Sequence, residues 1–221
     1  MFIPIGDDNS KRVSFPFVTF ALIASNVVMF YIEMQRGDTF VVKWSVLPLD
    51  YTSGFPPIQT LITAMFMHAG WAHLLGNMLY LFVFGDNVED RLGHFRYLVF
   101  YLLCGMIAFL AQIIAYPSSN IPNLGASGAI SGVLAAYLIL YPKNKVRVLM
   151  GFFIVNVSAW FVLGLWIVTQ LVSGSVDVFN RASNATGGIA YMAHIGGFAS
   201  GALLVFLLRH NVREARLDDT S

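Results

Sequence analysis

Six apolar stretches recur along the chain, separated by shorter segments that carry most of its charged and turn-forming residues. A helix needs about 20 apolar residues to cross the ~30 Å hydrocarbon core of a bilayer. The second and fourth stretches are short for this purpose and are expected to extend into their flanks. The pattern predicts six membrane-spanning helices at Phe15–Met34, Trp71–Phe84, Phe95–Tyr116, Ser127–Tyr141, Val148–Val172 and Gly188–Leu208.

No Gly/Ser-rich linker, low-complexity tract or repeat divides these stretches. We therefore expect one all-α membrane domain over residues 1–221, a six-helix bundle with short tails at about residues 1–14 and 209–221. The long segment from Gln35 to Gly70 is partly apolar and is expected to lie at the membrane interface. Within it, Ile58–His68 is expected to form an amphipathic turn that leads into the second helix.

The composition agrees with a membrane protein and excludes other classes. The 221 residues are 57% hydrophobic and only 11% charged, against about 25% charged residues in a typical soluble domain. With a net charge of only +1, the chain is not expected to bind nucleic acid. Its apolar composition makes the lipid bilayer the expected partner. Cys104 is the single cysteine, which excludes a disulfide scaffold and favours a packing role. His-Glu-x-x-His and similar patterns are absent, so neither a metal nor another cofactor is expected.

Lysine and arginine set the orientation of such a chain, because they concentrate on the cytoplasmic side of the membrane. With six spans, one side receives ten of these residues and the other side receives three. We therefore expect a multi-pass protein of the plasma membrane with both termini in the cytoplasm. The cytoplasmic set is Lys11, Arg12, Arg91, Arg96, Lys143, Lys145, Arg147, Arg209, Arg213 and Arg216, and the outer set is Arg36, Lys43 and Arg181.

Polar side chains inside membrane spans are costly and usually face the protein interior or a water-filled cavity, and four of those in the predicted spans form a set. They are His73 and Asn77 in the second span, Ser127 at the start of the fourth and His194 in the sixth. All three spans run from outside to inside, and each residue lies within about seven residues of the outer end. At 1.5 Å per residue, the four groups fall within roughly 10 Å of that end, in one layer.

This layer contains the groups that acyl transfer needs. His73 and Asn77 are four residues apart, so they share a helix face, and both can donate hydrogen bonds. Ser127 follows Pro122 and Gly125 at the start of a helix, where free backbone N–H groups favour negative charge. A hydroxyl, an imidazole and clustered donors can supply a nucleophile, a general base and an oxyanion hole.

Glycines spaced four residues apart provide the close helix packing that this layer requires. Small residues at this spacing let transmembrane backbones approach closely. We expect them to bring Ser127 within hydrogen-bonding reach of His194. The pairs are Gly128 and Gly132 in the fourth span, and Gly197 and Gly201 in the sixth.

At these residues the sequence resembles the rhomboid family of intramembrane serine proteases. Each matching motif is common by itself, but their ordered combination is specific and covers about Thr60 to Leu208. The motifs are His73-x-x-x-Asn77, Gly125-x-Ser127-Gly128, Ala193-His194-x-x-Gly197-x-x-x-Gly201 and Gly85-x-x-x-Glu89-x-Arg91-x-Gly93.

The resemblance implies a serine endopeptidase with a Ser–His dyad and no acidic third member. It would cleave transmembrane segments of single-span membrane proteins near the outer side of the bilayer. By position, Ser127 would be the nucleophile and His194 its general base. His73, Asn77 and the Ser127 backbone N–H would bind the oxyanion.

The resemblance also implies supporting elements. Glu89 and Arg91 would anchor the cytoplasmic turn after the second span, and His68 matches a structural histidine of the family. A substrate helix would enter through a lateral gate, for which the bulky fifth span is the candidate.

Two positions depart from the pattern of some relatives. Ser131 stands one turn after Ser127, where some relatives place an aromatic residue that stacks on the catalytic histidine. We therefore expect His194 to be oriented by another group. Leu124 replaces a glycine found before the motif, which leaves the backbone donors of that loop open.

Two other classes of function remain open from the sequence. A non-catalytic rhomboid-like protein would bind transmembrane segments in quality control or trafficking, but such proteins usually lack the serine or the histidine. A transporter or channel would continue the polar layer to the cytoplasmic side. There, the second, fourth and sixth spans are mainly Leu, Phe, Ile and Ala.

Overall fold

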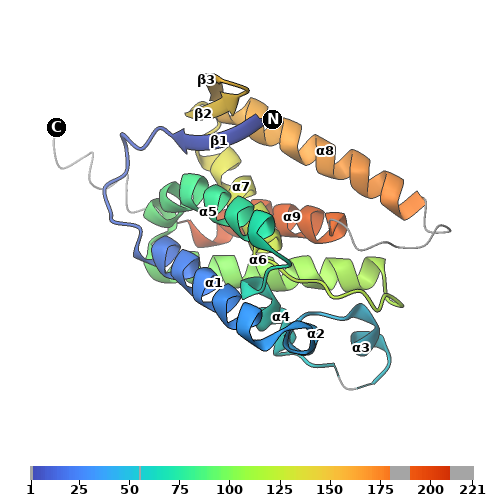
Figure 1. Cartoon of the computed structure of the whole chain (residues 1–221). Helices are drawn as coiled ribbons and strands as arrows, with labels where there is room; N and C mark the ends of the chain where they lie inside the picture. Colours follow the sequence, from blue (N-terminus) through green and yellow to red (C-terminus); the bar gives the residue numbers. More distant parts are fainter. Residues whose placement is uncertain (1, 55, 180–189, 210–221) are drawn as a thin grey trace.

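The computed structural model describes residues 2–54, 56–179 and 190–209, and most of these are helical (Figure 1). In this part of the chain, six long helices follow the order of the six predicted spans, which confirms the helical membrane bundle. The predicted start of the sixth span at Gly188 lies outside the described residues, as do Arg181, Arg213 and Arg216. The helices are α1 (Phe17–Arg36), α5 (Trp71–Leu92), α6 (His94–Ala115), α7 (Ser127–Leu140), α8 (Ala159–Phe179) and α9 (Tyr191–Leu208).

Four of the described helices are long and apolar enough to cross a membrane, namely α1, α6, α8 and α9. Helix α7 is apolar but has 14 residues. Helix α5 has 22 residues and carries its charged residues at its C-terminal end, among them Asp86, Glu89 and Arg91. The chain is therefore a multi-pass membrane protein.

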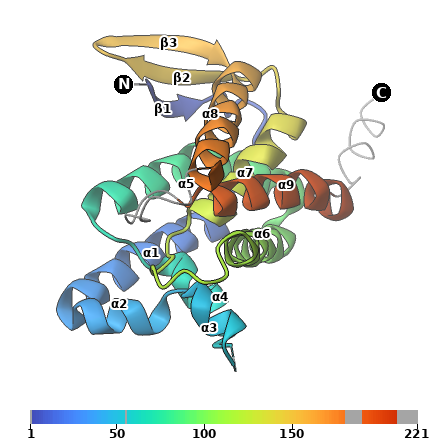
Figure 2. The ribbon, with the colours of Figure 1, turned by 90° about the vertical axis from the view of Figure 1, so that its right-hand side faces the viewer.

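Helix α7 lies in the middle of the bundle and contacts α5, α6 and α9 (Figure 2). Every residue of this helix from Gly128 to Tyr137 is buried. Its glycines allow α9 to pack against it backbone to backbone. A Cβ atom at Gly197 would overlap the carbonyl oxygen of Gly128, and one at Gly201 would overlap that of Gly132. The two predicted glycine stripes therefore form the interface between α7 and α9.

The fifth span begins later than predicted. Helix α8 starts at Ala159 rather than at Val148. The residues before it form an antiparallel hairpin of β2 (Lys145–Met150) and β3 (Phe153–Ser158).

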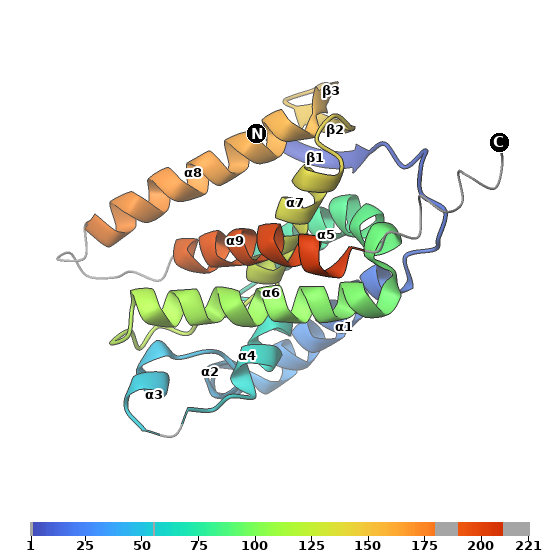
Figure 3. The same cartoon turned by 180° about the vertical axis from the view of Figure 1, so that it is seen from behind.

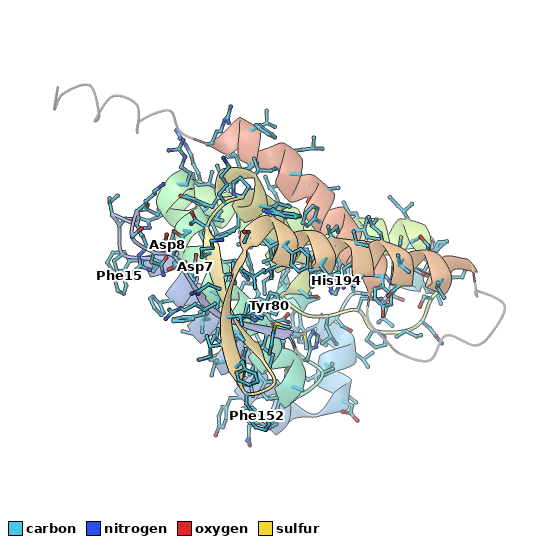
Figure 4. The ribbon with its side chains drawn as sticks, turned by 90° about the horizontal axis from the view of Figure 1, so that it is seen from above. Asp7, Asp8, Phe15, Tyr80, Phe152 and His194 are labelled. Atoms are coloured by element: carbon cyan, nitrogen blue, oxygen red, sulfur yellow. The ribbon has the colours of Figure 1, made fainter. Side chains whose placement is uncertain are left out.

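The hairpin is apolar both at its buried strand positions and at its exposed tip, which explains why the fifth span was predicted to begin at Val148. Val146 and Val148 of β2 are buried and alternate with exposed neighbours, a period of two that fits a strand. At the tip, Phe152 and Phe153 are exposed, and Figure 4 shows Phe152 at the end of the hairpin. Apolar content alone therefore did not distinguish this hairpin from a membrane helix.

A third strand, β1 (Phe2–Asp7), completes a sheet in the order β1–β2–β3. This strand lies within the segment predicted as an N-terminal tail. The Asp7 carboxylate accepts hydrogen bonds from Asn87 Nδ2 at 2.6 Å and from the Tyr137 hydroxyl at 2.5 Å. The sheet thus joins the N-terminal segment to α5 and α7, and it lies beside the start of α8 (Figure 3).

The charged end of α5 holds the start of α1. The Glu89 carboxylate is fully buried and accepts hydrogen bonds from the backbone N–H groups of Val18 and Thr19 at 2.8 and 2.7 Å. These N–H groups belong to the first turn of α1 and have no partner within the helix. The same carboxylate contacts Nδ1 of His94 at 2.5 Å. Glu89 therefore ties α1 to the turn between α5 and α6.

Short helical turns occupy the segment between α1 and α5. The last two lie within the predicted amphipathic turn that leads into α5. They also contact the segment before α7, since the Ala64 carbonyl accepts a hydrogen bond from the Gly125 N–H at 2.8 Å. The segment before Ser127 is therefore fixed by the segment between α1 and α5. The turns are α2 (Asp38–Trp44), α3 (Pro48–Thr52), α4 (Thr60–Thr63) and η1 (Ala64–Phe66).

Candidate active site

Ser127 is the first residue of α7 and lies half-buried at the N-terminus of that helix. Its Oγ lies 2.9 Å from Nε2 of His194 on α9, although the two residues are 67 positions apart. The close glycine packing of α7 on α9 makes this contact possible. Gly125 shapes the approach to the serine, because its φ of +120° is a conformation that favours glycine.

Helix α8 holds the other side of His194. The imidazole Nδ1 lies 2.8 Å from Oε1 of Gln170, and the Trp166 ring lies 5.9 Å away at an angle of 37°. Figure 4 shows His194 beside this helix. An amide oxygen only accepts hydrogen bonds, so Nδ1 carries the proton and Nε2 presents its lone pair to the serine. The Ser127 hydroxyl therefore donates to His194, which is the arrangement of a nucleophile and its base.

Gln170 and Trp166 were not among the residues predicted from the sequence. Gln170 is a polar side chain within an apolar span, and this signal could have drawn attention to it. Trp166 is one of several bulky residues in that span and gives no signal of its own. Their position beside His194 depends on how α8 is rotated, which the sequence pattern did not fix.

His73 and Asn77 of α5 lie against the loop that precedes Ser127. A Cβ atom at Gly125 would lie 2.8 Å from His73 Nε2 and 3.6 Å from Asn77 Nδ2. His73 Nδ1 accepts a hydrogen bond from the Ala69 N–H at 3.4 Å. This leaves Nε2 as the protonated nitrogen of His73, on the side of Gly125. Two N–H donors from α5 therefore flank the backbone that leads to the serine.

Asn77 contacts the buried His68, which in turn contacts the buried Glu33. His68 is 2% exposed, and its Nε2 lies 3.0 Å from Asn77 Nδ2. Its backbone N–H donates to Oε2 of Glu33, on α1, at 3.1 Å. Within the described part of the chain, Oε1 of Glu33 and Nδ1 of His68 are buried and have no hydrogen-bond partner. Asn77 is thus supported by a polar group in the segment between α1 and α5.

The structure brings the four residues predicted for the site into one region. Ser127 and His194 are in direct contact, and His73 and Asn77 lie against Gly125, two residues before the serine. The hydroxyl of Ser131, one turn after Ser127, donates to the Ser127 carbonyl at 2.6 Å. The arrangement fits acyl transfer. Among the described residues, no group of three or more His, Cys, Asp or Glu side chains is placed to hold a metal ion.

Comparisons with known proteins agree in pointing to one family. The family model described as the Rhomboid domain matches residues 57–211. The chain is similar to the putative rhomboid protease YdcA of Bacillus subtilis (strain 168), with 29% identity over 87% of this chain and 88% of that protein. It is also similar to the rhomboid protease GluP of the same organism, with 32% identity over 59% of this chain and 26% of that protein.

Relatives also occur in organelles. Rhomboid-like protein 11, chloroplastic, of Arabidopsis thaliana is 27% identical over 82% of this chain. Rhomboid protein 1, mitochondrial, of Saccharomyces cerevisiae (strain ATCC 204508 / S288c) is 30% identical over 90% of this chain. The chain spans 64% of the length of the first and 55% of the length of the second.

Proposed function

This chain belongs to the rhomboid family, and we propose that it is an intramembrane serine endopeptidase that cleaves transmembrane segments of membrane proteins. The observation that carries the proposal is the 2.9 Å contact between Ser127 Oγ and His194 Nε2. It lies within helices of a membrane bundle, where such a polar pair is costly unless it serves a purpose. The protease relatives YdcA and GluP support the same class of reaction.

The dyad would act in two steps. Ser127 Oγ attacks the carbonyl carbon of the scissile peptide bond, and its proton passes to His194 Nε2. The tetrahedral intermediate collapses as the C–N bond breaks, and the leaving amine takes that proton from His194. A water molecule then attacks the acyl-enzyme with His194 again as the base. This releases the new carboxyl end and restores the serine.

Three donors would stabilise the negative oxygen of the intermediate. They are the Nε2–H of His73, the Nδ2–H of Asn77 and the backbone N–H of Ser127. The last lies at the N-terminus of α7, where the helix dipole favours negative charge. Donors that are fixed before the reaction need no reorganisation when the charge develops, which makes this the largest single contribution in many enzymes.

We propose that the site lies near the outer side of the bilayer and that both termini are cytoplasmic. Helices α5, α7 and α9 all begin near the site and end on the opposite side. At that opposite end, Lys11, Arg91, Lys143 and Arg209 line one cleft. Such a concentration of lysine and arginine is typical of the cytoplasmic side. We further propose that the protein resides in the plasma membrane and that its substrates are single-span membrane proteins.

Purified protein in detergent, incubated with a helical model substrate, tests the function. We expect cleavage by the wild-type protein and none by Ser127→Ala or His194→Ala. A fluorophosphonate probe should label wild-type protein but not Ser127→Ala. If neither cleavage nor labelling occurs while a related protease is labelled under the same conditions, the chain is a non-catalytic binder of transmembrane segments. Cleavage that persists in Ser127→Ala would show that the assigned nucleophile is wrong.

A further inference from the structure

The His194 ring is held by two different helices, one on each nitrogen. Nε2 contacts Ser127 on α7 at 2.9 Å, and Nδ1 contacts Gln170 on α8 at 2.8 Å. Gln170 lies 24 positions before His194, with the whole α8–α9 connection between them. The base therefore depends on an element that contributes neither the nucleophile nor the oxyanion donors.

The amide of Gln170 determines which nitrogen of His194 is basic. Its Oε1 accepts from Nδ1–H, which leaves the lone pair on Nε2 and facing Ser127. In the other tautomer the proton would sit on Nε2, and that nitrogen could not accept the serine proton. Loss of the acceptor would let the ring populate both tautomers and rotate. Orientation of an imidazole through its second nitrogen is how acidic third members act in other serine hydrolases.

A second contact from α8 supports the same ring. Trp166 lies one helical turn before Gln170, so the two side chains share a face of α8. The Trp166 ring packs against His194 at 5.9 Å and against Phe198 at 6.3 Å. On α7, one turn after the nucleophile, the Ser131 hydroxyl donates to the Ser127 carbonyl. The aromatic support of His194 therefore comes from α8.

Helix α8 contacts the bundle along one face, near its beginning and again near its end, where a Cβ atom at Gly174 would lie 2.9 Å from the Met192 Cε. Val162 and Leu163 are buried, with 5% and 0% exposure. Farther along, the residues that face away from the bundle are 46 to 59% exposed, among them Leu165, Val168 and Val172. Across the 18 residues Ala159–Val176, 22% are buried, against 44% of the corresponding window of α6. A small displacement of this helix would break a 2.8 Å hydrogen bond to His194.

We propose that Gln170 is a positioning residue that acts through His194, so that the dyad is competent only while α8 lies against α9. This inference rests on the proposed protease function. Under this inference α8 contributes a side chain that the catalytic base needs. Entry of a substrate helix would require α8 to move away from the bundle. While it is displaced, His194 would lack the hydrogen bond from Nδ1 to Gln170 and would not act as the base until α8 returns.

Variants at position 170 test the proposal with full-length protein in detergent. Gln170→Leu removes the acceptor, and we expect kcat to fall by about tenfold or more with KM little changed. The rate of fluorophosphonate labelling of Ser127 should fall by a similar factor, because labelling needs the base but no substrate helix. Gln170→Glu keeps an acceptor oxygen and should restore both rates to within a few-fold. Thr169→Val, an exposed neighbour on α8, is the matched control and should leave both rates unchanged.

The outcomes separate this inference from the proposed function. Wild-type rates in a folded Gln170→Leu variant would overturn the positioning role. A fall in kcat with unchanged labelling would also overturn it, since Gln170 would then act on substrate entry. Failure of the wild-type protein to cleave or label would instead contradict the protease function. In that case the ring 15N shifts of His194 still decide the inference: Nδ1 protonation in wild type should be lost in Gln170→Leu, and unchanged shifts would overturn it.

Discussion

Asn77 Nδ2 lies 3.0 Å from Nε2 of the buried His68, so one N–H of this amide is occupied behind the site. The amide nitrogen only donates, so His68 Nε2 accepts and the proton of that ring sits on Nδ1. The second N–H of Asn77 remains for the side that faces Gly125. The contact therefore fixes which end of the Asn77 amide is presented to the site.

Removal of this support should slow turnover. In His68→Phe the Asn77 amide loses its acceptor and is free to rotate, and we expect kcat to fall by about tenfold. The effect should disappear in an Asn77→Ala background, because His68 would no longer have a donor to orient. A double-mutant cycle on cleavage rates measures this coupling. Fully additive effects would show that His68 acts on the fold rather than through Asn77.

Direct loss of the oxyanion donor should have a larger effect. Removal of one such donor typically costs about 2.7–4 kcal/mol, or roughly 100- to 1000-fold in kcat. We expect a reduction of that order in Asn77→Ala, with a melting temperature close to that of wild type. Cleavage assays and thermal unfolding in detergent give the two readouts. Unchanged turnover would mean that His73 and the Ser127 N–H suffice without Asn77.

The sequence predicted the helices and the four site residues for related reasons. Long apolar runs have few alternatives to membrane helices, and polar groups such as Ser127 and His194 stand out within them. The glycine spacing then indicated which helices touch. These features are local or repeat along one helix, so a pattern can show them.

Other parts of the structure could not be read in this way. Residues 145–158 form a hairpin whose first strand also pairs with β1, and that partner comes from the N-terminal end of the chain, about 140 positions away. Gln170 meets His194 only because α8 is rotated toward α9. Pairing and rotation are set by tertiary contacts, which compete with local preference and often override it.

The α7–α9 interface should not tolerate a side chain. In Gly197→Ala the new Cβ would overlap the Gly128 carbonyl, which is backbone and cannot move without separating the helices. Overpacking of this kind typically costs 1–3 kcal/mol, and separation of the helices would also lengthen the contact between Ser127 and His194. We expect a lower melting temperature together with loss of cleavage.

Gly164 on α8 provides the matched control for this substitution. A Cβ there would have no atom within 4 Å. Alanine is favoured over glycine within helices by about 1 kcal/mol, so Gly164→Ala should leave stability equal or higher. A Gly197→Ala variant as stable as Gly164→Ala would contradict the tight interface.

The N-terminal strand should make stability depend on pH. Burial raises the pKa of Asp7 from 3.8 to about 7; the hydrogen bond from Tyr137 opposes this, and the charge of Asp86 adds to it. The charges of Asp8 and Arg12 act in opposite directions and are smaller. Between pH 3.8 and about 7 the folded protein therefore binds more protons at Asp7 than the unfolded chain does. The free energy of unfolding must fall as pH rises through this window.

Asp7→Asn removes the titration but keeps an oxygen that can accept from Tyr137. We expect the wild-type melting temperature in detergent to fall by several degrees from about pH 5 to about pH 8, and the slope to flatten in the variant. Asp8→Asn is the control, because hydrogen bonds with Ser10 lower the pKa of that exposed carboxyl. Because its pKa lies below 3.8 in the folded protein, this group is almost fully ionised in both states above pH 5, and its loss should leave the wild-type fall in place. An Asp7→Asn variant with the wild-type slope would place the pH dependence elsewhere in the chain.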